Sequence, residues 1–513
     1  MSNILPVSIT APGFYGLNLQ DSSIDLPVGF AQTAINCVID KYGRIGSRQG
    51  WSPVNSTSVA LGTANVQALF ELVALSGASY DIVCGNNKLF TLSGGVLTEL
   101  TYGGGGVAPT ITASNWQIAS LNGIAYLFQS GHDPLVFDPA TSTTTYKRVS
   151  EVAGYSGTVP QANCVISAYG RLWAANTVGD KTTVAFSDLL GGMKWTGGTS
   201  GSINLSNVWP NGGDEITAIG AHNGFIIFFG KRQILIYTGA TTPSTMSLSD
   251  AIDSVGCVAR DSVQNIGTDL LFLSGAGVKS LARTIQEKSS PIHDVSKNVR
   301  DHLIQDIRSE NVDLIKSVYS DVNSFYLLTF PTVGETYCFD TKMPLPDGAL
   351  RVTTWSLMPK AMCARRDKTL YLGLAGYIGN YTGYIDNTST YTMSYYTNNM
   401  TFGDPNQESI LKKIGAVIIG GNGQAITVRY AYNYSTNYNS QIITLRNNVQ
   451  PSLYGVAEYG IGQYSFGIIT NTVSTNVGGS GKVVQVAFDT TINGYQVSYQ
   501  KIDIYAKNGK IVM

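Results

Sequence analysis

The sequence predicts an all-β protein: a β-propeller that follows an extended N-terminal arm and precedes a C-terminal β-sandwich-like domain. Nearly every apolar run is short, rich in Val, Ile, Tyr, Phe or Thr, and ends in Gly, Asn, Asp or Ser. Such runs are typical of strands that tight turns separate. Hairpin-like units also recur at spacings of roughly 35 to 55 residues, which bracket the length of one propeller blade.

Each recurring unit consists of a small polar turn followed by an apolar strand. The units are GNNKLFTL (85–92), LNGIAYLF (121–128), AYGRLWAA (168–175), HNGFIIFF (222–229), QNIGTDLLFL (264–273), DVNSFYLLTF (321–330) and RDKTLYLGL (366–374). Because a four-stranded blade leaves an edge that its neighbour must cover, we expect a closed ring. We assign residues 59–400 to this propeller, and the uneven matches leave the number of blades open.

Residues 1–58 contain many glycines and prolines and predict an extended arm. We expect this arm to have no core of its own and to pack on another domain or subunit.

One segment in the propeller departs from the β pattern. Val295, Val299, Leu303 and Ile307 recur at helical spacing with charges between them, which predicts an amphipathic helix near 295–310.

The tract 376–409 is rich in Tyr, Asn and Thr and nearly free of charge. Its tyrosines suit an interface between subunits, which we favour, or a platform that stacks sugars. The composition changes after it, so we place a domain boundary near Met400–Glu408 and a C-terminal domain at 401–513. Segments 410–433 and 483–507 alternate apolar and polar residues around GGNG and NG, which predicts two β-hairpins.

Composition excludes several classes of protein. The 513 residues include 33 Lys or Arg and 34 Asp or Glu, for a net charge of −1, and 43% are hydrophobic. A disordered chain would carry more charge and fewer apolar groups, and a protein that binds DNA tightly would be basic. We expect no membrane-spanning segment, because no run of 18 apolar residues occurs, and no signal peptide, which implies assembly in the cytoplasm.

The sequence shows no signature of a catalytic, cofactor or metal site. Motifs such as GxSxG and the P-loop are missing, and no CxxC or HExxH spacing occurs. We expect reduced cysteines, no catalytic residues, no cofactor and no metal. Three carboxylate pairs could in principle serve a glycosidase, although none lies in an aromatic setting: Asp21 and Asp25, Asp250 and Asp253, and Asp301 and Asp306. The last pair falls on the predicted helix, where we expect solvated surface.

The most specific stretch is 13–51, GFYGLNLQDSSIDLPVGFAQTAINCVIDKYGRIGSRQGW. A glycine-rich lead is followed by NCVID (36–40), GRI (43–45) and RQG (48–50). In this order the stretch resembles the opening of the tail nozzle proteins of short-tailed bacteriophages, the family of tail tubular protein B and the phage DNA-stabilisation proteins. Segments 222–239 and 256–283 resemble that family's propeller core, and 481–511 is similar to its closing β domain.

The resemblance implies a non-enzymatic protein of the phage tail within the virion. Such subunits form a ring, expected to be a hexamer, below the portal and adaptor complex and beside tail fibres or spikes. The ring would retain packaged dsDNA and conduct it during ejection without tight binding, which a net charge near zero suits. The alternatives are a carbohydrate-binding or carbohydrate-cleaving phage receptor protein built on a propeller, and a bacterial propeller scaffold outside any virus.

Five residues of this stretch are our candidates for docking or for anchoring the arm: Asn36, Asp40, Arg44, Arg48 and Trp51. Guanidinium and indole groups are frequent anchors of interfaces. The simpler alternative is that the two arginines pair with Asp40 or Asp25 on the surface.

Overall fold

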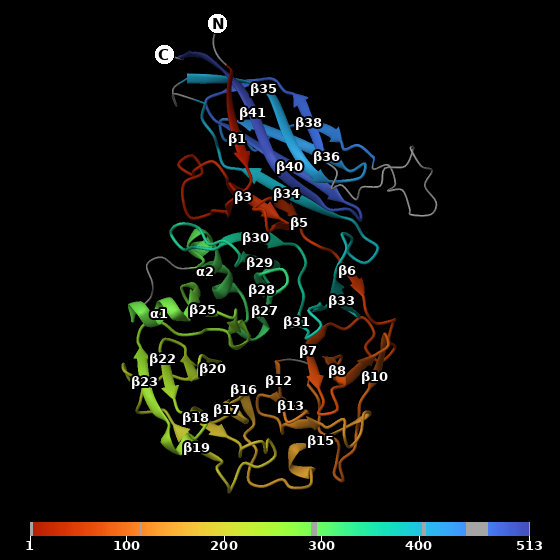
Figure 1. Ribbon diagram of the computed structural model, residues 1–513, viewed down its shortest axis with the longest axis vertical. Helices are drawn as coiled ribbons and strands as arrows, with labels where there is room; N and C mark the ends of the chain where they lie inside the picture. Colours follow the sequence, from red (N-terminus) through yellow and green to blue (C-terminus); the bar gives the residue numbers. More distant parts are fainter. Residues whose placement is uncertain (1–3, 113–114, 289–294, 403–406, 448–469, 512–513) are drawn as a thin grey trace, which may run out of the picture.

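The computed structural model describes residues 4–112, 115–288, 295–402, 407–447 and 470–511. Figure 1 shows two β bodies stacked along the long axis of the molecule. One is a ring of sheets, and the other is an elongated body at whose far end both termini lie. The chain is therefore a propeller joined to a second β domain, as the sequence predicts.

The ring contains six full blades and one smaller sheet within the described residues. The first four blades are β7 (Val66–Val73) to β10 (Val96–Glu99), β12 (Trp116–Leu121) to β15 (Thr145–Arg148), β16 (Ala162–Ala168) to β19 (Gly201–Asn204), and β20 (Ile216–His222) to β23 (Ser247–Ile252). Their middle strands are β8 (Ser79–Gly85), β9 (Lys88–Ser93), β13 (Ile124–Gln129), β14 (Leu135–Phe137), β17 (Arg171–Thr177), β18 (Asp180–Phe186), β21 (Phe225–Gly230) and β22 (Ile234–Thr238). A short strand, β11 (Thr101–Tyr102), runs parallel to β15.

The remaining sheets complete the circle. The smaller one has three strands, β24 (Gln264–Asn265), β25 (Leu270–Ser274) and β26 (Gly277–Ser280), and runs into helix α1 (Leu281–Glu287). The fifth full blade is β27 (Lys316–Ser320), β28 (Phe325–Phe330), β29 (Glu335–Asp340) and β30 (Arg351–Trp355). The last is β31 (Ala361–Ala364), β32 (Leu370–Gly373), β33 (Ile378–Tyr381) and β6 (Trp51–Pro53). Because β6 precedes the first blade in the chain, the N-terminal arm itself closes the ring.

The tight turns between blade strands explain why the repeating units are recognisable in the sequence. In the second blade Asn122 and Gly123 have φ values of 53° and 75°, and in the fourth Asn223 and Gly224 have 49° and 84°. Two successive residues with positive φ match the twist of antiparallel strands, and Asn-Gly tolerates that backbone best. The Asn-Gly dipeptides therefore mark the turn between the first two strands of each of these blades.

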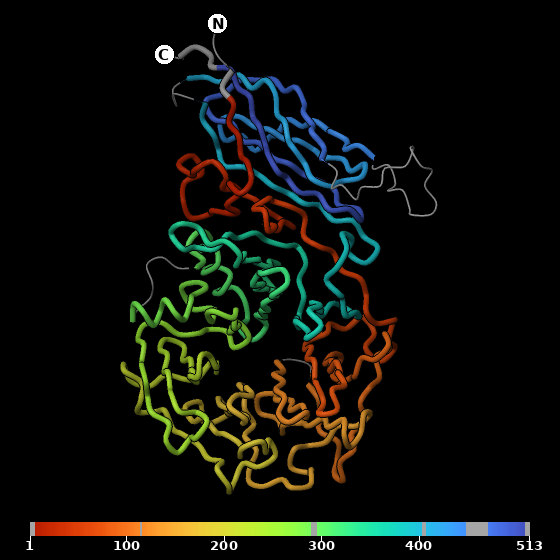
Figure 2. The backbone as a smooth tube through the Cα atoms, viewed as in Figure 1, coloured from red at the N-terminus to blue at the C-terminus, as the bar shows by residue number. Residues whose placement is uncertain are grey.

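The arm has no core of its own and packs on other parts of the chain, as expected, but it is more than an extended segment because its strands join the sheets of both bodies. It supplies β1 (Ile4–Thr10), β2 (Gly16–Leu17), β3 (Phe30–Ile35), β4 (Cys37–Ile39) and β5 (Ile45–Ser47). Strands β2 and β3 lie between β30 of the propeller and β34 (Tyr391–Thr397) of the second body, so one ten-stranded sheet runs through both bodies. Figure 2 shows this red segment between the green part of the ring and the blue C-terminal body.

The second body is a sandwich of two sheets. One holds β38 (Thr470–Asn476), β35 (Gln407–Gly420), β41 (Val497–Ile511), β5 and β4, with β1 and β39 (Ser480–Gly481) beside them. The other is the end of the ten-stranded sheet, with β34, β40 (Val484–Ile492), β36 (Ala425–Tyr432) and β37 (Asn439–Thr444). The predicted boundaries at 58 and 400 do not coincide with sheets, because β6 belongs to a blade and β34 to the sandwich.

The two predicted hairpins are wrong in their pairing, although their strands exist. Strand β35 pairs with β41, and β36 pairs with β40, so each predicted hairpin has its two strands in different sheets. The turn between β35 and β36 begins at Gly420 and Gly421, with φ values of 84° and 87°. These glycines let the chain cross from one sheet to the other instead of folding back beside itself.

The predicted helix is confirmed as α2 (Arg300–Ser309), which a 3₁₀ turn at Lys297–Val299 precedes. All four residues of its predicted apolar stripe are buried. They belong to one hydrophobic core that also contains Phe14 and Ala34 of the arm and Ile502 of the sandwich. This shared core fixes the two bodies against each other.

Candidate functional site

Arg48 lies at the centre of the junction between the arm, the last blade and the sandwich. Its side chain is 0% exposed and donates from Nη1 and Nη2 to the two carboxylate oxygens of Asp386, at 2.9 and 2.7 Å. Its Nε donates to Oδ1 of Asn36 at 2.9 Å, and its guanidinium stacks 4.1 Å from the ring centre of Tyr391. Such a bidentate, fully buried pair fixes geometry in a way that a lysine could not.

Asn36 connects the same junction to two further strands. Its Nδ2 donates to the carbonyl of Thr392 at 2.7 Å, and its Oδ1 accepts from the backbone N–H of Ser356 at 3.0 Å. Its φ of 56° lies in the left-handed region, which Asn tolerates better than most residues. Asn36 thereby satisfies groups of β34 and of the segment after β30 at the point where the arm turns from β3 to β4.

The other three candidates anchor the last third of the arm to both bodies. Asp40 accepts from the backbone N–H of Tyr42 and Arg44 and closes the β4–β5 turn. Arg44 lies 3.7 Å from Asp40 and donates to Oε1 of Gln500 on β41 at 2.5 Å. Trp51 lies in β6, and its N–H donates to a carbonyl of the segment that follows β33. The arm is thus held to both the sandwich and the last blade.

These positions change the interpretation of the five candidates. Arg48 and Asn36 are buried and use their polar atoms within the chain, so neither is available to a docking partner. The predicted surface pairing holds for Arg44 with Asp40, but Arg48 pairs with Asp386, which no spacing in the sequence indicated. A docking role for this stretch would depend on exposed residues such as Tyr42, which is 52% exposed.

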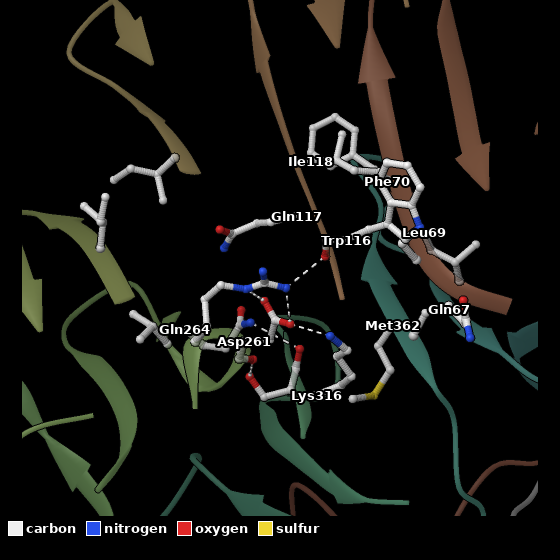
Figure 3. A pocket seen from close by; sticks show the side chains of 17 residues that line it. Gln67, Leu69, Phe70, Trp116, Gln117, Ile118, Asp261, Gln264, Lys316 and Met362 are labelled. Carbon is white, nitrogen blue, oxygen red and sulfur yellow. Dashed lines mark hydrogen bonds and ion pairs between the residues drawn. The ribbon is translucent and has the colours of Figure 1, made fainter. Parts of the chain in front are cut away.

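A second candidate site is a cavity of about 230 Å³ on the axis of the ring. Residues of the first strand of every sheet in the ring line it, as do residues of a 3₁₀ turn at Arg260–Ser262. Figure 3 shows Asp261 and Lys316 facing each other, with Gln264 beside them and Trp116 above. The axis of the propeller is therefore where side chains from the whole ring meet.

Charged groups hold this axis together. Arg260 donates from Nη1 to the carbonyl of Asn163 at 2.6 Å and from Nη2 to the carbonyl of Trp116 at 3.0 Å. It also forms an ion pair with Asp261 at 2.8 Å, and Lys316 contacts the same carboxylate. Burial alone would raise the pKa of Asp261, but the charges of Arg260 and Lys316 outweigh it and hold that pKa well below its usual range. The charged groups of this cluster are thus paired with one another and with backbone carbonyls of the ring.

A third candidate site is a cavity of about 340 Å³ beside the second blade. Polar side chains line much of it, namely Gln129, His132, Asp133, Arg148 and Gln161. Arg148 lies 3.4 Å from Asp133, and Nε2 of His132 is within hydrogen-bond distance of the Thr112 hydroxyl. Amides, a carboxylate and a guanidinium in one cavity are suited to a small polar ligand.

The predicted carboxylate pairs have separate roles. Asp253 accepts from Asn211, and Asp301 accepts from Gln20 of the arm at 2.9 Å. The expectation of solvated surface is wrong for Asp306, which is 6% exposed. Burial raises the pKa of Asp306, and a hydrogen bond from Tyr337 offsets this only in part. Helical periodicity could not reveal this burial, because β29 covers the helix face from another part of the chain.

The cysteines and tyrosines lie largely within the fold. All six cysteines are free thiols, and all but Cys363 are buried, as predicted. Of the tract 376–400, Tyr381, Tyr391 and Tyr395 are buried in the chain's own core. These rings pack within the protein, so they form neither a sugar platform nor an interface between subunits.

No helix of the described chain is both long and apolar enough to cross a membrane.

Comparisons with known proteins identify no family for this chain. No protein-family model and no curated protein matches the chain. Among solved structures it is similar to the extracellular domain of BT4673 from B. thetaiotaomicron, with 12% identity and a TM-score of 0.43 over 84% of this chain and 60% of that one. It is also similar to PorZ of the Porphyromonas gingivalis type-IX secretion system, with 11% identity and a TM-score of 0.36 over 64% of this chain and 37% of that one.

The WD40 β-propeller of Doa1 is a third similar structure, with 8% identity and a TM-score of 0.36 over 64% of this chain and 96% of that one. The chain thus spans 37% of the length of PorZ and 60% of that of the BT4673 domain, less than two thirds of either.

Proposed function

We propose that this chain is a structural subunit of the tail nozzle of a short-tailed bacteriophage. In this proposal six copies form a ring below the portal and adaptor complex, beside the tail fibres or spikes, and hold and then conduct dsDNA. The observation that carries the proposal is the junction: the stretch that resembles the nozzle family, 13–51, is the one that joins the propeller to the sandwich.

The junction suits a subunit that must transmit force. Domains of one chain usually meet through small polar interfaces that allow relative motion. Here a ten-stranded sheet, a shared hydrophobic core and the buried pair of Arg48 and Asp386 replace such an interface. A ring built from subunits of this kind would resist bending between its propeller and sandwich layers.

The axis of the propeller is too narrow for the proposed cargo. A cavity of about 230 Å³ has the volume of a sphere roughly 8 Å across, whereas the major groove of DNA alone is about 12 Å wide. Arg260, Asp261 and Lys316 also meet in this cavity. If the protein conducts DNA, the conduit must be the lumen that a ring of copies encloses.

A second candidate function is carbohydrate recognition, and the cavity beside the second blade favours it. Its side chains Gln129, Asp133, Arg148 and Gln161 are of the kinds that hydrogen-bond sugar hydroxyls. Glycan-array binding by the purified chain, lost in Arg148→Ala and kept in a variant of the propeller axis such as Gln264→Ala, would support this candidate.

Quantitative mass spectrometry of density-gradient-purified phage particles tests the nozzle proposal. The protein should be present at about half the copy number of the portal protein, as six copies beside a twelvefold portal require. Absence from particles would overturn the proposal. A copy number that is an odd multiple of three would contradict a single sixfold ring and favour a receptor-binding protein.

A further inference from the structure

Three side chains with metal-binding atoms meet between helix α2 and strand β29. His302 and Asp306 are one turn apart on α2 and share a face, and Glu335 begins β29. Nδ1 of His302 lies 3.7 Å from Oδ2 of Asp306 and 3.9 Å from Oε2 of Glu335. The three ligand atoms all lie within 4.8 Å of one another.

The charge at this point is not balanced by the protein. Among the described residues, neither Asp306 nor Glu335 forms an ion pair with a lysine or an arginine, and each has only His302 as an ion-pair partner. Glu310, the further charged group that acts on Asp306, is also acidic. Since Asp306 is nearly buried, water screens the repulsion between the carboxylates poorly. A bound cation would neutralise both.

We propose that His302, Asp306 and Glu335 form a binding site for a divalent transition-metal ion, with zinc as the best match. An imidazole nitrogen together with two carboxylates favours zinc and its neighbours over magnesium or calcium, which prefer oxygen ligands alone. Three protein ligands leave a fourth position for water. The ligand atoms, now up to 4.8 Å apart, would have to draw together by up to about 1.4 Å to surround zinc tetrahedrally, and the 43% exposed side chain of His302 has room to move.

Tyr337 completes the arrangement. It lies two residues after Glu335, so both side chains project from the same face of β29. Its hydroxyl donates to Oδ2 of Asp306 at 2.5 Å and lies 2.8 Å from Nδ1 of His302. When the metal takes Nδ1, the hydrogen bond to Asp306 remains and orients that ligand, as outer-shell partners of metal sites do.

The site would fasten α2 to the blade. Helix α2 already contacts the arm through Asp301 and Gln20, and Glu335 belongs to the blade whose last strand, β30, adjoins the arm. A metal that joins the helix to β29 would therefore stiffen the propeller side of the ten-stranded sheet. We expect the metal to raise the thermal midpoint without changing the secondary structure.

The test is isothermal titration calorimetry of the full chain, freed of metal with EDTA and dialysed, with zinc chloride as the titrant. One saturable site per chain is expected. His302→Ala and Glu335→Gln should each weaken zinc binding by at least roughly tenfold. His222→Ala, which removes a histidine of the fourth blade, is the matched control and should bind as the parent chain does.

Circular dichroism checks that each variant is folded, and the two substitutions at partly exposed ligands avoid the buried Asp306. Lack of saturable zinc binding would overturn the proposal, and so would equal binding by all three variants. Titrations with magnesium and calcium chloride decide the class of metal. Binding of either as tight as that of zinc would contradict a role for the imidazole.

Discussion

Replacing Arg48 by methionine should open the junction. The substitution keeps much of the side-chain volume but removes the bidentate pair with Asp386 and the hydrogen bond to Asn36. Removing one partner of a buried ion pair costs about 3 to 5 kcal/mol. We expect the lower end, about 3 kcal/mol, because Asp386 is 19% exposed and regains some contact with water.

Hydrogen exchange measured by mass spectrometry reports this loss where it occurs. The N–H groups of Gly50 and Trp51 donate to the carbonyls of Gly383 and Ile385, so they exchange only when the arm leaves the last blade. A loss of about 3 kcal/mol predicts roughly 100-fold faster exchange of these amides. Strands of the fourth blade should exchange as before.

Two further substitutions separate the buried pair from an exposed one. Lys88→Ala breaks an exposed pair with Glu99 and should cost at most about 1 kcal/mol. In a cycle with Asp386→Asn, the double variant should lose less than the sum of the single losses. If Arg48→Met exchanges no faster than Lys88→Ala at the junction, or if the losses simply add, the buried pair does not hold the arm.

Three further predictions concern other parts of the chain. Neighbouring cations hold the pKa of Asp261 low, so its charge stabilises the fold above about pH 4, the pKa of an unfolded aspartate, and this stabilisation is lost as the pH falls further. The difference in thermal midpoint between Asp261→Asn and the parent chain should therefore shrink below about pH 4. A difference that stays constant with pH would contradict the pairing. Gly50→Ala would place its Cβ 2.0 Å from the carbonyl oxygen of Ile385, so we expect a loss of about 1 to 3 kcal/mol in urea unfolding and partial release of β6. Burial raises the pKa of Cys363 to about 11, and the other five thiols are more deeply buried, so Ellman's reagent at pH 8 should react slowly with the native chain and count six thiols after denaturation.

Turns and helices that depend on residues close together in the chain could be predicted from the sequence. The Asn-Gly turns of the blades and the helical spacing of Val295 to Ile307 are local patterns, and the structure confirms both. The two sandwich hairpins failed because pairing depends on which sheet receives each strand, and alternation alone does not specify a partner.

Residues of the sites were predictable only in part. The stretch around Arg48 stood out, but its partner Asp386 lies 338 positions away, and nothing local marks that pair. The group at His302 was missed because one of its three ligand atoms comes from another element, Glu335 on β29. Clusters that the fold assembles from distant strands leave no spacing to detect in a single sequence.

The closure of the ring by β6 has a consequence for how the chain is made. Trp51–Pro53 is translated early, yet its partner Ile378–Tyr381 emerges some 330 residues later, a delay of roughly 20 to 60 seconds at common rates of synthesis. Until then β6 has no partner strand in the nascent chain, and the last blade is incomplete. The yield of folded protein from recombinant expression should therefore depend on holdase chaperones. An N-terminal fusion that keeps the arm from reaching its partner strand should favour misassembly between neighbouring nascent chains.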